Sequence, residues 1–182
     1  MKIISALEEY KKSSNEIACF LAGGCTSLEW RTKVYEELDK TTLNSLVIFD
    51  PYNSNITDPE KQIEWEFNYL NKYKNDFFIF SVYFDKYTDQ PISMYELGRA
   101  SVLCKEQAVK VGPWNDPFMN NTQCFHLAWG FPMVVSVHPE APKRKDIFTQ
   151  CKLADIMALE RTPEQHAQAI RHQYNIIRSR LK

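Results

Sequence analysis

Five short apolar segments punctuate this chain and alternate with amphipathic stretches. The most β-like is Phe77–Phe84, in which aromatic and β-branched residues predominate, and we expect it to be a central strand. The four others are Ile17–Leu21, Leu46–Phe49, Ala108–Val111 and Pro132–Val137. Strands that alternate with helices are joined by crossovers and lie parallel in a sheet that is covered on both faces. This rhythm therefore restricts the chain to an α/β architecture.

We expect one three-layer, doubly wound α/β domain over residues 1–182, with about five mostly parallel strands and a flavodoxin- or Rossmann-like arrangement. The expected helices cover residues 27–39, a segment after Asp58-Pro59, a segment from Ser93, a short piece within 122–129, and two C-terminal stretches, 145–159 and 163–182. We expect the C-terminal helices to pack on the same sheet.

Capping patterns indicate where these helices begin. Thr26-x-x-Glu29, Ser93-x-x-Glu96 and Thr162-x-x-Gln165 match the capping box, in which two side chains satisfy free N–H groups at a helix start. Pro59 suits the first helical position, where a missing N–H costs nothing. We therefore expect a cap at each of these places.

Charge and glycine content exclude several function classes. The chain has 22 Lys and Arg against 23 Asp and Glu, a net charge of −1, which argues against a nucleic-acid partner because phosphate binding needs surplus cations. The five glycines form neither of the two glycine-rich phosphate loops, G-x-G-x-x-G and G-x-x-x-x-G-K-[ST]. Dinucleotide and triphosphate chemistry is therefore not expected.

Compartment, metal and cofactor expectations follow from further absences in the sequence. Residues 1–10 lack the apolar stretch of a signal peptide, and no apolar run approaches the roughly 20 residues of a membrane span. The five cysteines are odd in number and widely spaced, as in a reduced protein, and the histidines lack zinc-ligand spacing. We expect a cytoplasmic protein with no membrane partner, metal or cofactor.

The expected sheet topology places candidate site residues on one edge. In parallel sheets, ligands bind beyond the carboxyl ends of the strands, near the point where the strand order reverses. The segments that follow expected strands are Gly23-Gly24-Cys25, Asp50-Pro51, Asp85 and Gly112-Pro113-Trp114. The chemistry of the protein should lie among them.

Three segments together resemble the nucleoside 2-deoxyribosyltransferase family, including its phage members and the 2′-deoxynucleoside 5′-phosphate N-hydrolases. They are Phe20–Thr26 with Trp30-Arg31, Gln62–Glu66, and Ser93–Ala100. The resemblance covers roughly residues 17–110, with weaker support from 132–137. It implies a small-molecule nucleoside or nucleotide and a free base as partners, a homo-oligomer, and a host cytoplasmic location if the protein is phage-encoded.

The resemblance assigns the nucleophilic carboxylate to Glu96. Cleavage of an N-glycosidic bond passes through an oxocarbenium-like transition state, which a carboxylate stabilises or traps as a covalent intermediate. A glutamate in the first turn of a helix should have a lowered pKa because of the helix dipole. The alternative is that Glu96 only caps the helix with Ser93.

The leaving base needs a proton from a second group. In the transferases an aspartate several residues before the nucleophile serves the base. Here Asp89 lies seven residues before Glu96 and Asp85 eleven before, whereas the position six before is Gln90. Asp89 is our candidate, and an exposed loop aspartate is the alternative.

The remaining candidates would bind substrate. Each also has an ordinary structural role open to it, as a turn, a solvated helix face or a loop. They are Gly23, Gly24, Cys25, Asp50, Gln62, Glu66, Asp85, Ser93, Trp114 and Asn115.

Three functions remain open at this point. The first is glycosyl transfer between bases through a covalent deoxyribosyl-enzyme intermediate on Glu96, and the second is an N-glycosidase in which water replaces the acceptor base. The third is a non-catalytic nucleotide-binding module that keeps the fold and uses Glu96 as a cap.

Overall fold

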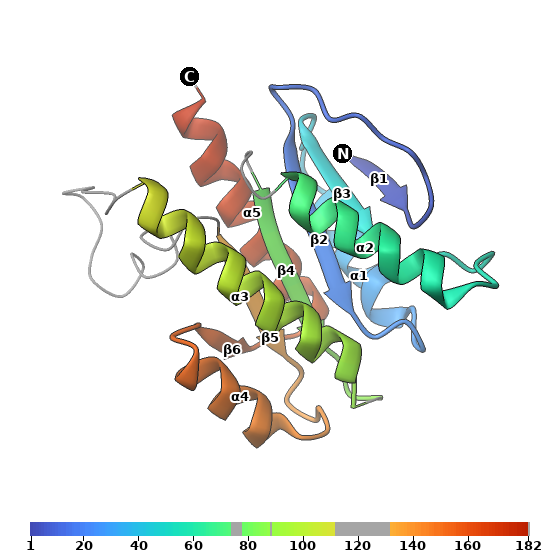
Figure 1. The fold of residues 1–182 in the computed structure, drawn as a ribbon, viewed down its shortest axis with the longest axis vertical. Helices are drawn as coiled ribbons and strands as arrows, with labels where there is room; N and C mark the ends of the chain where they lie inside the picture. Colours follow the sequence, from blue (N-terminus) through green and yellow to red (C-terminus); the bar gives the residue numbers. More distant parts are fainter. Residues whose placement is uncertain (74–77, 88, 112–131, 182) are drawn as a thin grey trace.

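The computed structural model describes residues 1–73, 78–87, 89–111 and 132–181 (Figure 1). In these residues six strands form one parallel sheet in the order β1-β3-β2-β4-β5-β6. The strands are β1 (Lys2–Ser5), β2 (Ile17–Gly23), β3 (Leu46–Asp50), β4 (Phe78–Phe84), β5 (Met133–Val137) and β6 (Ala158–Glu160). The expected α/β fold class is confirmed, and β4 lies inside the sheet as expected.

Helices cover both faces of this sheet, which makes three layers (Figure 1). Helices α1 (Glu29–Asp39) and α5 (Pro163–Arg180) pack on one face. Helices α2 (Pro59–Tyr73), α3 (Pro91–Val111) and α4 (Arg144–Leu153) pack on the other.

The two cores follow from the alternation of side chains along the buried strands. In β2, Phe20 and its even-numbered neighbours face α2 and α3, whereas Cys19 and its odd-numbered neighbours face α1 and α5. Every residue of β2 and β4 is buried. Because both faces are covered, these strands consist of continuous apolar runs.

The strand order reverses between β2 and β4. From β2 the chain crosses to β3 on one side, and from β3 it returns to β4 on the other side of β2. The last residue of β2, Gly23, pairs with Tyr83 near the end of β4. The loop after β2 and the loop after β4 therefore start side by side, which is where ligands bind in such sheets.

Two expectations about the strands are wrong. Residues Ala108–Val111 form the last turn of α3, because a four-residue apolar run does not distinguish a strand from a buried helix end. The edge strands β1 and β6 escaped prediction because they are short and half-exposed, so no buried apolar run marks them. The helix expected over residues 145–159 ends earlier, at Leu153, because β6 follows and was not predicted.

The capping predictions had mixed outcomes. The capping box of Thr162 and Gln165 at the start of α5 is confirmed, and α2 begins at Pro59 as predicted. Helix α1 begins at Glu29 after Leu28, without the side-chain cap expected from Thr26. The box at Ser93 is wrong because α3 begins at Pro91. The short helix expected within residues 122–129 lies outside the described residues.

Across the described residues, no helix is long and apolar enough to cross a membrane. The expectation of a cytoplasmic location stays a prediction.

A buried histidine links α5 to the sheet. His166 has no exposed surface, and its two ring nitrogens lie 2.7 Å from Ser81 Oγ on β4 and 2.7 Å from Ser136 Oγ on β5. Burial, followed by the charge of Arg161, lowers the pKa of His166 to about 3. The imidazole is therefore neutral in the folded protein at neutral pH.

We predict that His166 makes the protein less stable as the pH falls below about 6.5. The unfolded imidazole binds a proton below its ordinary pKa, whereas the folded one binds it only near pH 3. The loss is about 1.4 kcal/mol for each pH unit within that window. Urea unfolding of the parent and of His166→Gln between pH 7 and 5 measures it.

The difference between these two proteins isolates the histidine, because the other titrating groups are the same in both. His172→Gln, at an exposed position of α5, is the matched control and should behave as the parent. An equal pH dependence in the parent and His166→Gln would contradict the prediction.

Candidate functional site

A pocket of about 480 Å³ opens at the carboxyl edge of the sheet, where the strand order reverses. The loop after β2, the loop after β4 and the first turns of α2 and α3 surround it. Its lining consists of Gly23, Gly24, Cys25, Thr26, Pro51, Pro59, Gln62, Ile63, Glu66, Asp89, Gln90, Pro91, Ile92, Ser93 and Glu96.

Most of the candidates from the sequence meet at this pocket. Asp50 and Asp85 do not line it but lie buried beside it, at 4% and 2% exposure. Trp114 and Asn115 lie outside the described residues. Sequence reasoning missed Arg31 and Tyr35, which approach from α1, although Arg31 belonged to a segment of the resemblance. A buried arginine has no signal of its own in a sequence.

Two carboxyl groups meet in the pocket. Glu66 on α2 and Glu96 on α3 are each only 6% exposed, and their side chains are hydrogen-bonded to each other. Gln62, one turn before Glu66, donates from Nε2 to Glu66 Oε1 over 2.9 Å. A hydrogen bond between two carboxyl groups requires a proton on one of them.

The pKa of Glu96 lies well above its ordinary value. Burial is the main cause and the neighbouring Glu66 carboxylate is the second, whereas the charge of Arg31 acts in the opposite direction. Burial also raises the pKa of Glu66. The expectation of a lowered pKa for Glu96 is therefore wrong: Glu96 is the sixth residue of α3, so burial outweighs the helix dipole.

A buried ion pair lies beside the carboxyl pair. The Arg31 side chain is 2% exposed, and its Nη1 lies 2.8 Å from Asp50 Oδ1 at the end of β3. Tyr35 OH donates to Asp50 Oδ2, and the Tyr52 backbone N–H donates to Asp50 Oδ1 over 2.9 Å. Asp50 is therefore a structural partner of Arg31 with its oxygens already engaged.

The same guanidinium holds the loop after β2. Arg31 Nη1 donates to Leu21 O and Nη2 to Gly23 O, each over 3.0 Å. Gly23 has a φ of +147°, and a Cβ there would lie 2.5 Å from the Trp30 ring, so only glycine fits. The loop after β2 is thus held by side chains of α1.

Cys25 has the basic neighbour that sequence reasoning did not find. Arg31 Nη2 lies 3.7 Å from Cys25 Sγ. Burial nevertheless raises the pKa of the Cys25 thiol, and the opposing effect of Arg31 is smaller. The side chain is therefore a neutral thiol on the pocket wall at neutral pH.

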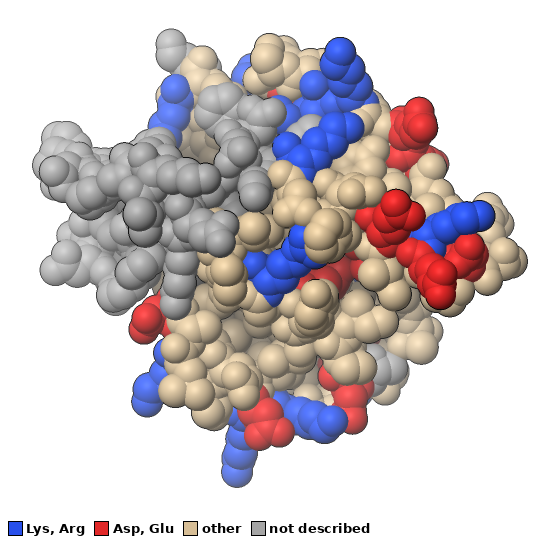
Figure 2. All heavy atoms as spheres, viewed as in Figure 1, with Lys and Arg blue, Asp and Glu red and all other residues tan. Residues whose placement is uncertain are grey.

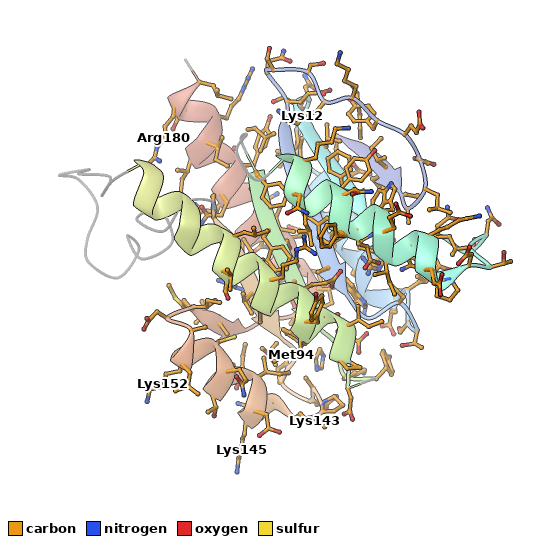
Figure 3. All side chains as sticks on the ribbon, in the orientation of Figure 1. Lys12, Met94, Lys143, Lys145, Lys152 and Arg180 are labelled. Atoms are coloured by element: carbon orange, nitrogen blue, oxygen red, sulfur yellow. The ribbon has the colours of Figure 1, made fainter. Side chains whose placement is uncertain are left out.

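Asp89 lies at the rim of the pocket. Its side chain is 53% exposed, and Oδ2 lies 2.8 Å from Nζ of Lys143 at the start of α4. Figure 3 shows Lys143 between α4 and the beginning of α3, whereas Lys145 and Lys152 point outward from α4. Asp89 is thus a solvated ion-pair partner rather than a buried acid.

Among the described residues, no group of three or more His, Cys, Asp and Glu side chains is placed to hold a metal ion. The polar groups of the pocket are carboxyl, amide, hydroxyl and thiol groups. They suit hydrogen-bond donors of a ligand and carboxylate chemistry on it.

Comparisons with known proteins agree with the geometry. A protein-family model described as "Nucleoside 2-deoxyribosyltransferase like" matches residues 16–112, which is more than half of the chain and includes every residue that lines the pocket. No curated protein matched the chain in a sequence search. The protein belongs to the nucleoside 2-deoxyribosyltransferase-like family.

Proposed function

We propose that this protein cleaves the N-glycosidic bond of a 2′-deoxynucleoside or deoxynucleotide and transfers the deoxyribosyl group to another base. The observation that carries the proposal is the buried, hydrogen-bonded pair of Glu66 and Glu96 in a pocket of a deoxyribosyltransferase-like protein. Two carboxyl groups that share a proton supply a nucleophile and an acid at one place.

In the proposed reaction, the proton that the pair shares first passes from Glu96 to Glu66 along their hydrogen bond. Glu96, now ionised, attacks the anomeric carbon C1′ as the bond from C1′ to the base nitrogen breaks. The electrons of that bond go to the base, which takes the proton held by Glu66. A C1′–O bond to Glu96 forms, which gives a covalent intermediate. An acceptor base then attacks C1′, returns its proton to Glu66 and releases Glu96.

Glu66 is a better-supported proton donor than Asp89. Burial raises the pKa of Glu66, so it holds a proton more readily at neutral pH. Asp89 is half-exposed at the rim of the pocket, and its carboxylate is already bound by Lys143. Asp89 then contributes to the rim of the pocket, and Asp85, Ser93 and Gln62 to its shape.

Two variants test these roles. We predict that Glu96→Gln lowers base release from deoxynucleosides by about 10³-fold or more, because an amide is not nucleophilic. Glu66→Gln should lower it by about 10²-fold. Chromatography of the products, with and without an added free base, measures release and exchange.

A leaving group that needs no proton separates the two roles. On an aryl 2-deoxyriboside with a nitrophenol leaving group, Glu66→Gln should retain most activity and Glu96→Gln none. Glu64→Gln, at an exposed position of α2, is the matched control. Parental activity of Glu96→Gln would refute the nucleophilic role of Glu96. Free deoxyribose as the only sugar product, even with a free base added, would identify water as the acceptor. No release from any substrate would indicate a binding module.

The charge of the pocket favours substrates without a 5′-phosphate. Glu66, Asp89 and Glu96 supply three carboxyl groups, and no Lys or Arg stands among the described lining residues. The nearby cations Arg31 and Lys143 are engaged by Asp50 and Asp89. A phosphate dianion would meet a negative field there.

We therefore predict that kcat/KM for a deoxynucleoside exceeds that for its 5′-monophosphate by about tenfold or more. Asp89→Asn removes one carboxylate and releases Lys143. It should therefore reduce the ratio of kcat/KM for the deoxynucleoside to kcat/KM for its 5′-monophosphate. Steady-state kinetics with matched pairs of substrates measure both effects. A preference of the parent for the monophosphate would contradict the prediction.

An exposed apolar face on α2 and α3 supports the expected homo-oligomer. Its members are Ile63 and Phe67 on α2 and Ile92, Tyr95 and Val102 on α3, all 48% exposed or more. Figure 2 shows uncharged surface over parts of these helices, interrupted by charged side chains. Gly98 lies among them, and a Cβ there would meet no described atom within 4 Å. Glycine is costly in a helix, so close approach of a second copy would give it a role.

We predict that the purified protein has a mass in solution of at least twice the 21.4 kDa of one chain. Tyr95→Lys combined with Val102→Lys should shift it to the monomer, because two charges would be buried in the interface. Leu153→Lys, on exposed α4, is the control and should not change the mass. Light scattering after size exclusion measures the mass, and a monomeric parent would contradict the prediction.

A further inference from the structure

One amide side chain joins the two loops that form the pocket. Gln90, the residue before α3, is 5% exposed. Its Oε1 accepts from the backbone N–H of Gly24 over 2.9 Å, and its Nε2 donates to Asp85 Oδ1 over 2.8 Å. The first bond crosses from the loop after β4 to the loop after β2, whereas the second lies within the loop after β4.

The backbone of Gln90 sets the start of α3. Its carbonyl accepts from the Met94 N–H over 3.2 Å, which is the first hydrogen bond of the helix. Its φ is +48°, a left-handed conformation that residues other than glycine rarely adopt. Such strain persists only where the surroundings hold the residue in place. The side-chain bonds to Gly24 and Asp85 contribute to holding Gln90 in this conformation.

The two loops also interlock by shape. A Cβ on Gly24 would lie 3.0 Å from Asp85 Oδ2 and 3.1 Å from Gln90 Cδ. These separations are tighter than ordinary contacts, so glycine at position 24 allows the Gln90 amide to reach its N–H.

We propose that Gln90 is a positioning residue: by joining Gly24 to Asp85 it fixes the start of α3, and with it Glu96, against the loop after β2. The inference rests on the proposed function of Glu96. Both the acceptor and a donor of the Gln90 amide are engaged within the protein, as a positioning role requires.

We call the two side-chain bonds from Gln90 to Gly24 and Asp85 the clamp. Its chemistry requires an amide at position 90. A glutamate at position 90 still accepts from Gly24 but has no proton to donate, and it brings a second carboxylate against Asp85. The two must share a proton or repel each other, so the clamp closes at low pH and opens at high pH. Other titratable or charged side chains near positions 85 and 90 include those of Cys25, Glu66, Asp89, Glu96, Arg31 and Lys143. They also include Tyr83, whose pKa is raised by burial and then by the charge of Asp85.

The test compares the full-length parent, Gln90→Glu, and the double variant Asp85→Asn with Gln90→Glu, in which the amide at position 85 donates to the single carboxylate at position 90. Asp85 Oδ1 also accepts from the Tyr87 backbone N–H over 2.8 Å, so the double variant gives up that bond. Hydrogen exchange of residues 23–28 reports the clamp without any substrate. Base release from a deoxynucleoside, followed from pH 5.5 to 8, reports the position of Glu96. Gln150→Glu, the same change at an exposed position of α4, is the matched control.

In Gln90→Glu, we expect the backbone amide hydrogens of residues 23–28 to exchange about tenfold faster than in the parent at pH 8. At pH 5.5 they should exchange at nearly the parental rate. The kcat of Gln90→Glu should fall by about tenfold over the same range relative to the parent, with little change in KM. In the double variant only one carboxylate remains, so both readouts, taken relative to the parent, should stay constant within about threefold from pH 5.5 to 8.

Parental exchange and parental rates in Gln90→Glu at pH 8 would overturn the proposal. A double variant that keeps the pH dependence of Gln90→Glu would also overturn it. If Gln90→Glu does not fold, a folded double variant whose exchange relative to the parent is independent of pH supports the clamp, and a pH-dependent one overturns it. If the parent releases no base, the proposed function falls, and with it the part of the inference that concerns Glu96. The exchange of residues 23–28 still decides whether Gln90 joins the loops.

Discussion

The buried ion pair between Arg31 and Asp50 is the constraint on which the site depends. Charges removed from water are tolerated only when partners satisfy them, and loss of one partner costs about 3–5 kcal/mol. Here the Tyr35 hydroxyl and the Tyr52 backbone N–H donate hydrogen bonds to Asp50. The backbone carbonyls of Leu21 and Gly23 accept from the Arg31 guanidinium. The pair thus ties α1 and the end of β3 to the loop after β2, and this loop forms one wall of the pocket.

The carboxyl pair takes its properties from this surrounding. Arg31 is neutralised locally by Asp50 but still opposes the rise of the Glu96 pKa. Burial and mutual repulsion act against two charges, so one proton remains on the pair of Glu66 and Glu96. A single negative charge beside a single acidic proton is the arrangement that glycosyl transfer requires.

Much of the fold could be predicted because local patterns decide it. The run Phe77–Phe84 is too apolar to be stable in water, which favours a central strand, and β4 covers Phe78–Phe84. The cap at Thr162 involves residues within one turn of α5. Predictions failed where a local pattern had two outcomes. Ala108–Val111 suits a strand or a helix end, and Ser93 with Glu96 fits a cap that exists only if the helix begins there. Of the site, the sequence indicated Glu96, Glu66 and Gly24 but neither the role of Arg31 nor the contacts of Gln90.

The sequence by itself determined the alternation of strands and helices, and with it a parallel sheet whose loops meet at one edge, because the side-chain period and the caps are properties of neighbouring residues. Only the tertiary structure decided the protonation of Glu96, the burial of Arg31 and the bonds of Gln90. These depend on residues far apart in the chain: Glu66 is 30 positions from Glu96, and Gly24 is 66 from Gln90. Their distance in space, and the water excluded between them, follow from the packing of the whole sheet.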